Sequence, residues 1–355
     1  MKFDLQRIQQ LESLEDEILV ERIQKIRESQ GKNLCILAHL YQRKKITELA
    51  DFVGDSFGLS QSAARSSGKY IVFAGVRFMA ESAAILCRSS QEVLHPDPEA
   101  GCPMADMASY SEVRRAWEYL KGAHPPVPVT YMNSTADIKA FCGEFGGTIC
   151  TSSNALKTFE WAFEKSSRVF FLPDEHLGRN TALKYGVDPE DIAVWDPEKA
   201  DGGEPENYES AKVILWRGYC PVHQKFTVRD IEQVRKFYPG AIVIVHPECP
   251  TEVVQAADEV GSTDFIRKFV AQKTKPGDKI FIGTEINLVQ NLATEYPDRM
   301  ITKLHRSLCL TMYQITLGRL LYTLENLETF ERVQVSTDVQ RYAKVALDRM
   351  LSLVI

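Results

Sequence analysis

The most constraining feature of this 355-residue sequence is a weak α/β pattern that occurs three times in succession after an N-terminal helical stretch. In each repeat, short apolar runs alternate with longer helical patterns and turn signals, which is typical of parallel strands joined by helices. Each repeat also places a polar residue at the end of its first strand, a serine near a later helix start and a cysteine after its third strand. The sequence therefore predicts an α/β fold with three similar αβα domains built on parallel sheets.

The repeat also predicts where the domains begin and end. The second unit is longer mainly through the insertion WDPEKADGGEPENY, and the segment from Leu310 onward has the pattern of an amphipathic helix that docks on the body. The expected divisions are an N-terminal helix in residues 1–28 (Leu11–Glu28), αβα units over 29–106, 107–221 and 222–309, and a C-terminal helical extension over 310–355.

Polar side chains recur where the first strand of each unit ends. They are His39, Tyr41, Tyr131, Asn133, His246 and Glu248. Ligands of parallel α/β sheets bind at the carboxyl ends of the strands, so three such ends facing one another would form one shared site. Among these residues Glu248 is the best candidate for a general acid or base, because burial beside the run AIVIVH would raise its pKa toward working pH.

Three of the eight cysteines, Cys102, Cys220 and Cys309, follow the third strand pattern of their units. They could be unrelated buried residues, since cysteine is among the most buried residue types. Alternatively, they could be three thiolates on one metal centre, as in a zinc site or an iron–sulfur cluster. Three ligands instead of four would leave one cluster iron open to act as a Lewis acid on substrate.

The recurring serines are Ser56, Ser152 and Ser262, the last followed by Thr263. Serine at a helix start predicts ordinary N-capping. If the three helix N-termini converged on one cavity, they would also bind anions. No Walker-type loop or GxGxxG motif is present to indicate a nucleotide.

The charge balance and the apolar runs exclude several classes of partner. The 42 Lys and Arg and 48 Asp and Glu residues give a net charge of −6, so a nucleic acid or an anionic membrane is not expected as a partner. No apolar run approaches the roughly 20 residues that span a bilayer, and the N-terminus has no signal-peptide core. These features predict a cytoplasmic protein with reduced thiols.

A set of longer motifs, in order along nearly the whole chain, resembles the quinolinate synthase family, the A protein of bacterial NAD biosynthesis. The motifs are AHLYQ (38–42), ADFVGDSFGLSQSA (50–63), VFAGVRFMAES (72–82), AGCPMADM (100–107), TYMNSTADIKAF (130–141), CTSSNALK (150–157), LWRGYCPVHQKF (215–226), HPEC (246–249), GST (261–263) and GTEINLVQ (283–290). Three positions depart from the family pattern: Leu310 follows Cys309 where Pro is usual, Arg77 stands where many members carry His, and Leu40 stands where Asn or Tyr is common.

The resemblance implies a pseudo-threefold arrangement of the three domains around one active site, with a [4Fe–4S] cluster held by Cys102, Cys220 and Cys309. It implies condensation of iminoaspartate with dihydroxyacetone phosphate to quinolinate, with transient contact with the enzyme that supplies iminoaspartate. The implied catalytic residues are Glu248, Tyr41, His39 and His246. The implied substrate-binding residues are His39, Ser56, Tyr131, Asn133, Ser152, His223, His246, Glu248, Ser262 and Thr263.

Two other functions are compatible with the same cysteines. A three-cysteine zinc lyase would lack the brown chromophore of a cluster. A non-catalytic iron–sulfur sensor would need a partner-binding or nucleic-acid-binding surface, and the sequence has neither a basic patch nor an appended domain for it.

Overall fold

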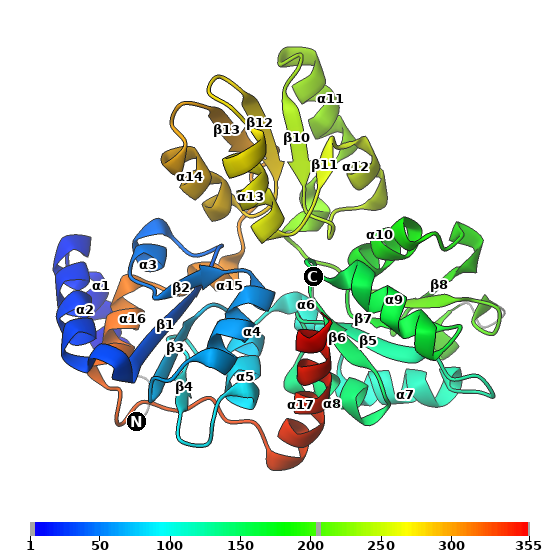
Figure 1. Ribbon diagram of the computed structural model, residues 1–355, viewed down its shortest axis with the longest axis horizontal. Helices are drawn as coiled ribbons and strands as arrows, with labels where there is room; N and C mark the ends of the chain where they lie inside the picture. Colours follow the sequence, from blue (N-terminus) through cyan, green and yellow to red (C-terminus); the bar gives the residue numbers. More distant parts are fainter. Residues whose placement is uncertain (1–3, 204–206, 354–355) are drawn as a thin grey trace. The chain divides into compact units, whose positions relative to one another are not determined.

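The computed structural model describes residues 4–203 and 207–353. Its strands form three sheets of four, five and four strands, all with parallel pairing, and helices flank each sheet (Figure 1). Parallel strands that are covered by helices on both faces need apolar side chains in nearly every position. The uninterrupted apolar runs in the sequence meet that need, and the α/β class with three similar αβα sheets is confirmed.

The first sheet has the strand order β2-β1-β3-β4. Its two central strands, β1 (Leu34–His39) and β3 (Tyr70–Ala74), are buried along their whole length. The other elements of this sheet and its helices are β2 (Phe52–Gly54), β4 (Glu92–Leu94), α3 (Lys44–Glu48), α4 (Ser56–Arg65) and α5 (Arg77–Leu86).

The second sheet has the order β6-β5-β7-β9-β8 and one strand more than the others. The additional strand β8 (Ile192–Trp195) pairs with β9 (Val213–Trp216) at the sheet edge, where the longer second repeat places its extra residues. The remaining elements are β5 (Val127–Tyr131), β6 (Thr148–Cys150), β7 (Val169–Leu172), α7 (Tyr110–Leu120), α8 (Ala136–Glu144), α9 (Ala155–Lys165) and α10 (Glu175–Tyr185).

The third sheet, β11-β10-β12-β13, has the same order as the first. In both sheets the first strand of the unit lies between the second and the third, so the ends of the first and third strands are neighbours. The elements are β10 (Ile242–Val245), β11 (Glu259–Val260), β12 (Lys279–Gly283), β13 (Met300–Lys303), α11 (Val228–Phe237), α12 (Thr251–Ala256), α13 (Thr263–Lys273) and α14 (Ile286–Glu295).

The chain separates into two compact units, residues 1–102 with 308–336 and residues 103–307 with 337–355. The first unit contains the first sheet, and the second unit contains the other two sheets and the short helix α6 (Pro103–Asp106). The domain boundaries expected at residues 28, 106, 221 and 309 remain predictions.

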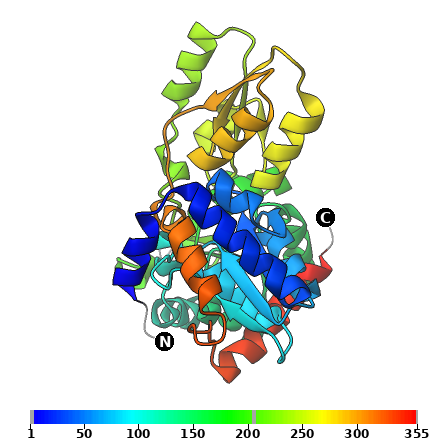
Figure 2. The same cartoon turned by 90° about the vertical axis from the view of Figure 1, so that its left-hand side faces the viewer.

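The terminal helices differ from the expected pattern. The helix expected over Leu11–Glu28 is two helices, α1 (Leu5–Glu12) and α2 (Asp16–Gln30). The helix expected from Leu310 is also two, α15 (Leu310–Tyr313) and α16 (Leu317–Glu325), and α16 packs against α1 and α2 within the first unit (Figure 2).

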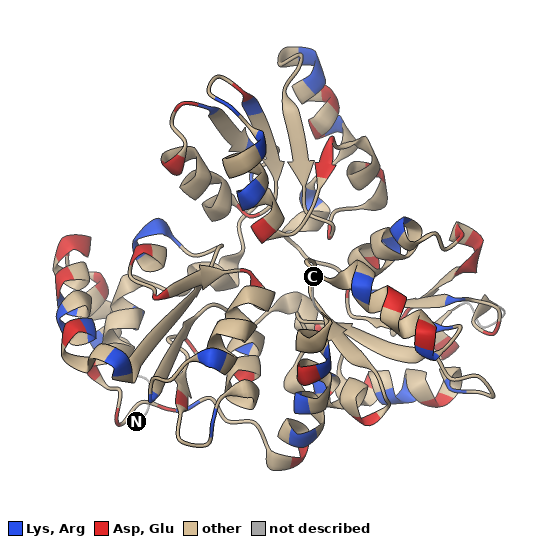
Figure 3. Ribbon diagram, viewed as in Figure 1, with Lys and Arg blue, Asp and Glu red and all other residues tan. Residues whose placement is uncertain are grey.

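The last helix, α17 (Thr337–Ser352), belongs to the second unit and packs along α8. A glycine is required at their crossing, because a Cβ atom on Gly143 would lie 1.9 Å from the carbonyl oxygen of Tyr342. Lys and Arg alternate with Asp and Glu over the helices of both units (Figure 3). In the part of the chain that the structure describes, no helix combines the length and the apolar character that a membrane crossing requires.

Candidate active site

Glu248 lies at the centre of a buried polar cluster in the second unit. It follows β10 in the turn 246–249 and is 2% exposed. Its Oε1 accepts a hydrogen bond from the Tyr131 hydroxyl at 2.5 Å, and its Oε2 lies 2.7 Å from Nδ1 of His223. A carboxylate in this position is desolvated but paired at both oxygens, which is the condition under which buried charge is tolerated.

Two histidines complete the cluster. The rings of His223 and His246 are stacked with centroids 4.4 Å apart, and both side chains are buried. Nε2 of His223 lies 3.0 Å from the hydroxyl of Thr284, which directly follows β12. Because a carboxylate can only accept, Nδ1 of His223 carries a proton and Thr284 faces the other ring nitrogen.

The pKa of Glu248 differs from the sequence-based expectation. Burial raises it, as expected, but the nearby His223 and His246 and the hydrogen bonds from His223 and Tyr131 together outweigh burial and lower the pKa to about 2. The expectation considered burial and omitted the basic partners. Glu248 is therefore a carboxylate at neutral pH.

Asp174 is a second buried carboxyl group near Glu248, and the sequence analysis missed it. It directly follows the cis Leu172–Pro173 peptide at the end of β7 and caps α10, with Oδ1 accepting from the backbone N–H groups of His176 and Leu177. Its Oδ2 has no hydrogen-bond partner among the described residues. Burial, with the charge of Glu248, raises the pKa of Asp174 well above its usual value. Its place at the end of a third strand was the available signal.

We expect Asp174→Asn to stabilise the protein increasingly as pH rises from about 4 to 7. A raised native pKa means that stability is fully present below the unfolded pKa of 3.8 and is lost at higher pH, where only the unfolded state releases the proton. Asparagine keeps the helix cap and has no proton to release. The difference in unfolding free energy should grow by up to about 1.4 kcal/mol per pH unit. Thermal unfolding of both proteins across this pH range measures it, and a pH-independent difference would contradict a neutral Asp174.

The recurring serines do not all cap helices. Ser262 does cap α13, with its hydroxyl accepting from the backbone N–H of Phe265 at 3.2 Å. At α4 the cap is Asp55 and Ser56 is the first helical residue, while Ser152 lies two residues before Asn154, the residue that precedes α9. The expectation of capping is wrong for Ser56 and Ser152, because an adjacent Asp competes at the first site and a turn separates serine from helix at the second.

The other predicted residues lie at strand ends as expected. His39 is the last residue of β1, and its Nδ1 accepts from the backbone N–H of Tyr41, whose ring meets the His39 ring edge-on. In the second unit Tyr131 ends β5, and Asn133 follows with a buried Oδ1 that has no partner among the described residues.

A cavity of about 480 Å³ in the second unit adjoins several predicted positions. It is lined by Ser152, by Pro247 from the turn that carries Glu248, and by Gly261, the neighbour of Ser262. Volumes of this order are typical of small-molecule sites. The second unit thus combines a concave surface with a buried acid–base cluster.

The sequence matches the family described as Quinolinate synthetase A protein over residues 21–352. The chain belongs to this family. It is 48% identical to quinolinate synthase from Acidobacterium capsulatum, with 96% of this chain and 94% of the relative aligned. It is 48% identical to quinolinate synthase from Corynebacterium glutamicum, with 96% of this chain and 88% of the relative aligned. It is 47% identical to quinolinate synthase from Geobacillus kaustophilus, with 96% of this chain and 95% of the relative aligned. Quinolinate synthases are enzymes, so the chain is one too.

For this quinolinate synthase family member, the cysteines fall into two groups. Burial raises the pKa of five thiols, which makes them poor sources of thiolate: Cys35, Cys87, Cys142, Cys150 and Cys249. The three cysteines of the repeat, Cys102, Cys220 and Cys309, are partly exposed. The Cys220 thiol, a ring nitrogen of His223 and a carboxylate oxygen of Glu248 all lie within 4.8 Å of one another. Cys220 therefore faces the acid–base cluster.

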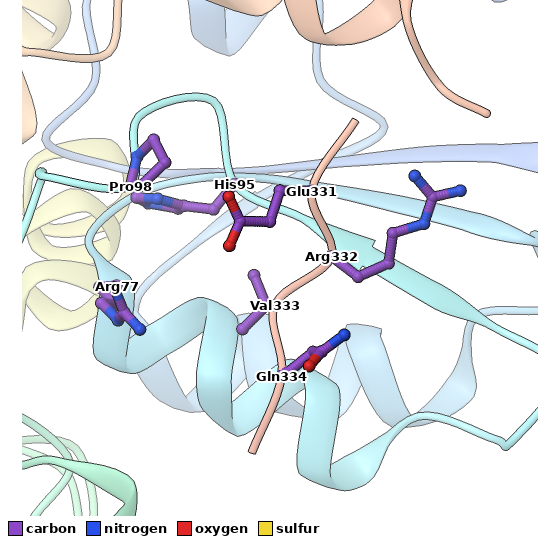
Figure 4. Close-up of a pocket in the computed structure, with 7 residues that line it drawn as sticks. All are labelled: Arg77, His95, Pro98, Glu331, Arg332, Val333 and Gln334. Atoms are coloured by element: carbon purple, nitrogen blue, oxygen red, sulfur yellow. The ribbon is translucent and has the colours of Figure 1, made fainter. Parts of the chain in front are cut away.

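Arg77, which stands where many family members carry His, lines a different cavity. This cavity, of about 120 Å³, lies in the first unit beneath the segment 331–334 (Figure 4). His95 is buried at its wall with Nε2 3.0 Å from the Gly75 carbonyl oxygen, and Arg77 pairs with Glu81 on its own helix. None of the residues predicted for the active site is among those that line it.

Proposed function

We propose that this enzyme condenses iminoaspartate with dihydroxyacetone phosphate in the cytoplasm, as a step of NAD biosynthesis. The products are quinolinate, one phosphate and two water molecules. The atoms of the two substrates account for all products, so each step is a condensation, an elimination or a proton shift, and no net oxidant is needed. The chemistry calls for a proton-transfer group, anion sites for a phosphate and carboxylates, and a means of helping oxygen leave.

The observation that carries this proposal is the pairing of Glu248 with Tyr131 and His223 beside the Cys220 thiol. A carboxylate that holds Nδ1–H of an imidazole makes the ring a better proton acceptor, in the manner of the carboxylate in hydrolase triads. We assign proton transfer during imine formation and dehydration to the Glu248–His223 pair, with Tyr131 as the second donor.

The remaining residues bind and orient the substrates. Ser262, at the N-terminus of α13, and Thr263 are suited to an anionic group, since the first backbone N–H groups of a helix attract negative charge. Asn133 brings an amide oxygen for a substrate donor, since that oxygen has no partner among the described residues. His39, Tyr41 and His246 are assigned to the triose oxygens, and Ser56 and Ser152 to further polar groups of the substrates.

Cys102, Cys220 and Cys309 would hold a [4Fe–4S] cluster. The donor set fits, since these three thiols are partly exposed while burial raises the pKa of the other five. With three protein ligands, the bound cluster would supply a Lewis acid through its fourth iron. The Glu248 carboxylate and a ring nitrogen of His223 lie within 4.8 Å of the Cys220 thiol, so the proposed proton-transfer pair would lie next to the cluster.

A second candidate is a zinc lyase, which one specific observation favours. The sulfur, nitrogen and oxygen donors of Cys220, His223 and Glu248 are a set that zinc accepts. In that case the pairing of Glu248 with His223 would be replaced by bonds to the metal.

Anaerobic purification followed by metal analysis and assay separates these functions. The proposal expects iron and sulfide in about equal amounts, close to four of each per chain for a full cluster. It also expects quinolinate from dihydroxyacetone phosphate and iminoaspartate generated in the assay. Stoichiometric zinc without sulfide would favour the zinc lyase, and a full cluster without quinolinate formation would contradict the proposed reaction.

A further inference from the structure

Asn180 clamps the turn that carries Glu248. It lies on α10, and its Nδ2 donates to two backbone carbonyls, those of Pro247 and Cys249, each at 2.9 Å. These two residues stand immediately before and after Glu248 in the chain. One side chain from another element therefore fixes the backbone on both sides of the proposed acid–base residue.

The turn needs such an external partner. Within it, the N–H of Cys249 donates to the carbonyl of His246 at 3.0 Å, which closes the turn but leaves the carbonyls of Pro247 and Cys249 without an internal donor. Cys249 is fully buried, so its carbonyl oxygen cannot rely on bulk water. Asn180 supplies the donors that keep both carbonyls satisfied and their peptide planes oriented.

The orientation of the Asn180 amide follows from its partners. Its amino end must face the two carbonyl oxygens, because turning the amide would place three oxygens against one another. The other end, Oδ1, is buried and has no partner among the described residues. Burying an unpaired amide oxygen costs stability. An apolar side chain would fill this position without that cost but could not donate a hydrogen bond. The two carbonyls that need a donor explain why an asparagine stands here.

We propose that Asn180 is a positioning residue that holds Glu248 in line with His223 and Tyr131. The inference rests on the proposed role of Glu248 in proton transfer. Glu248 makes hydrogen bonds of 2.5 and 2.7 Å with Tyr131 and His223. Both bonds depend on the distance and angle at which the turn presents the carboxylate, so loss of the clamp would misalign Glu248 while its own partners stay in place. Asn180 also lines the 480 Å³ cavity, so the test must separate a loss of alignment from a loss of substrate contact.

The direct test replaces Asn180 by Ala, which removes both donors, and by Asp, which keeps the size but places acceptor oxygens against the carbonyls. Displacements of about 1 Å can cost about 100-fold in rate, so kcat should fall roughly 10- to 100-fold in both variants, with a much smaller change in KM. Iron content should match wild type. The matched control is Thr158→Val on α9, since the Thr158 hydroxyl donates to the Asn154 carbonyl at the start of its own helix and Thr158 is not among the residues that line the 480 Å³ cavity, and kcat should be unchanged.

A double-mutant cycle with Glu248→Gln decides whether Asn180 acts through Glu248. If it does, Asn180→Ala should reduce kcat clearly in the wild-type background and by less than about threefold in the Glu248→Gln background, because the aligned group is already lost. Equal losses in both backgrounds would overturn the positioning role and leave the role of Glu248 intact. A folded Asn180→Asp enzyme with wild-type kcat would also overturn it. Near wild-type turnover in Glu248→Gln alone would instead overturn the proposed function of Glu248.

Discussion

Replacing any one of Cys102, Cys220 and Cys309 by Ala is expected to abolish the full [4Fe–4S] cluster and quinolinate formation with it. Two thiolates cannot hold a cluster that needs three protein ligands, and the other cysteines are poor replacements because burial raises their pKa. Iron, sulfide and the absorption of the cluster, measured on anaerobically purified protein, report the result directly and do not depend on turnover.

Cys87→Ala is the matched control, because Cys87 is also partly exposed but its thiol donates to the Ala84 carbonyl of α5, the helix that Cys87 directly follows. Its iron content should equal wild type. Full iron occupancy in Cys309→Ala would remove Cys309 from the ligand set, and Leu310 in place of the usual proline would then mark a changed loop. Zinc in place of iron in the wild-type protein would favour the alternative ligand group of Cys220, His223 and Glu248.

The central strands of the sheets were predictable from sequence, and the short edge strands were not. Runs such as AIVIV are long enough to show a continuous apolar pattern, and the strands that they predict are present. By contrast, β2, β6 and β11 have two or three residues each and were not predicted as strands. Strands this short have no detectable period, and pairing with a neighbouring strand, not local propensity, determines them.

For the candidate site, the sequence identified strand-end residues but not their partners. Glu248, His246 and Tyr131 were found because the repeat places polar residues after first strands. Thr284 and Asn180 were missed, since a threonine after β12 and an amide on α10 become informative only when the fold brings them to His223 and to the turn of Glu248. Asp174 was missed although its place after a third strand gave a signal. The prediction of a raised pKa for Glu248 was wrong for the same reason. Burial could be predicted from an apolar run, but the closeness of His223 and His246, whose effect on the pKa outweighs burial, could not.

Glu248→Gln is expected to reduce kcat by about 10²- to 10⁴-fold, the usual contribution of general acid–base catalysis, with the cluster intact. Glutamine has the same size, and its amide can still bond to Tyr131 and His223 after His223 exchanges its ring proton from Nδ1 to Nε2, toward Thr284. What it loses is the negative charge beside His223 and the capacity to take up a proton. The measurement is quinolinate formation under anaerobic conditions, with iron content recorded on the same samples.

Ser262→Ala provides the contrast that separates proton transfer from binding. Ser262 caps α13, and its loss should mainly raise KM for the phosphate-bearing substrate while kcat changes little. Glu248→Gln should instead lower kcat and leave KM nearly unchanged, because Tyr131, His223 and His246 remain in place to hold the substrate. If Glu248→Gln also raised KM and left kcat near wild type, the carboxylate would be a binding group. If that variant lost its iron, Glu248 would instead help to hold the metal site. Its carboxylate oxygen lies within 4.8 Å of the Cys220 thiol, which is close enough for such a role.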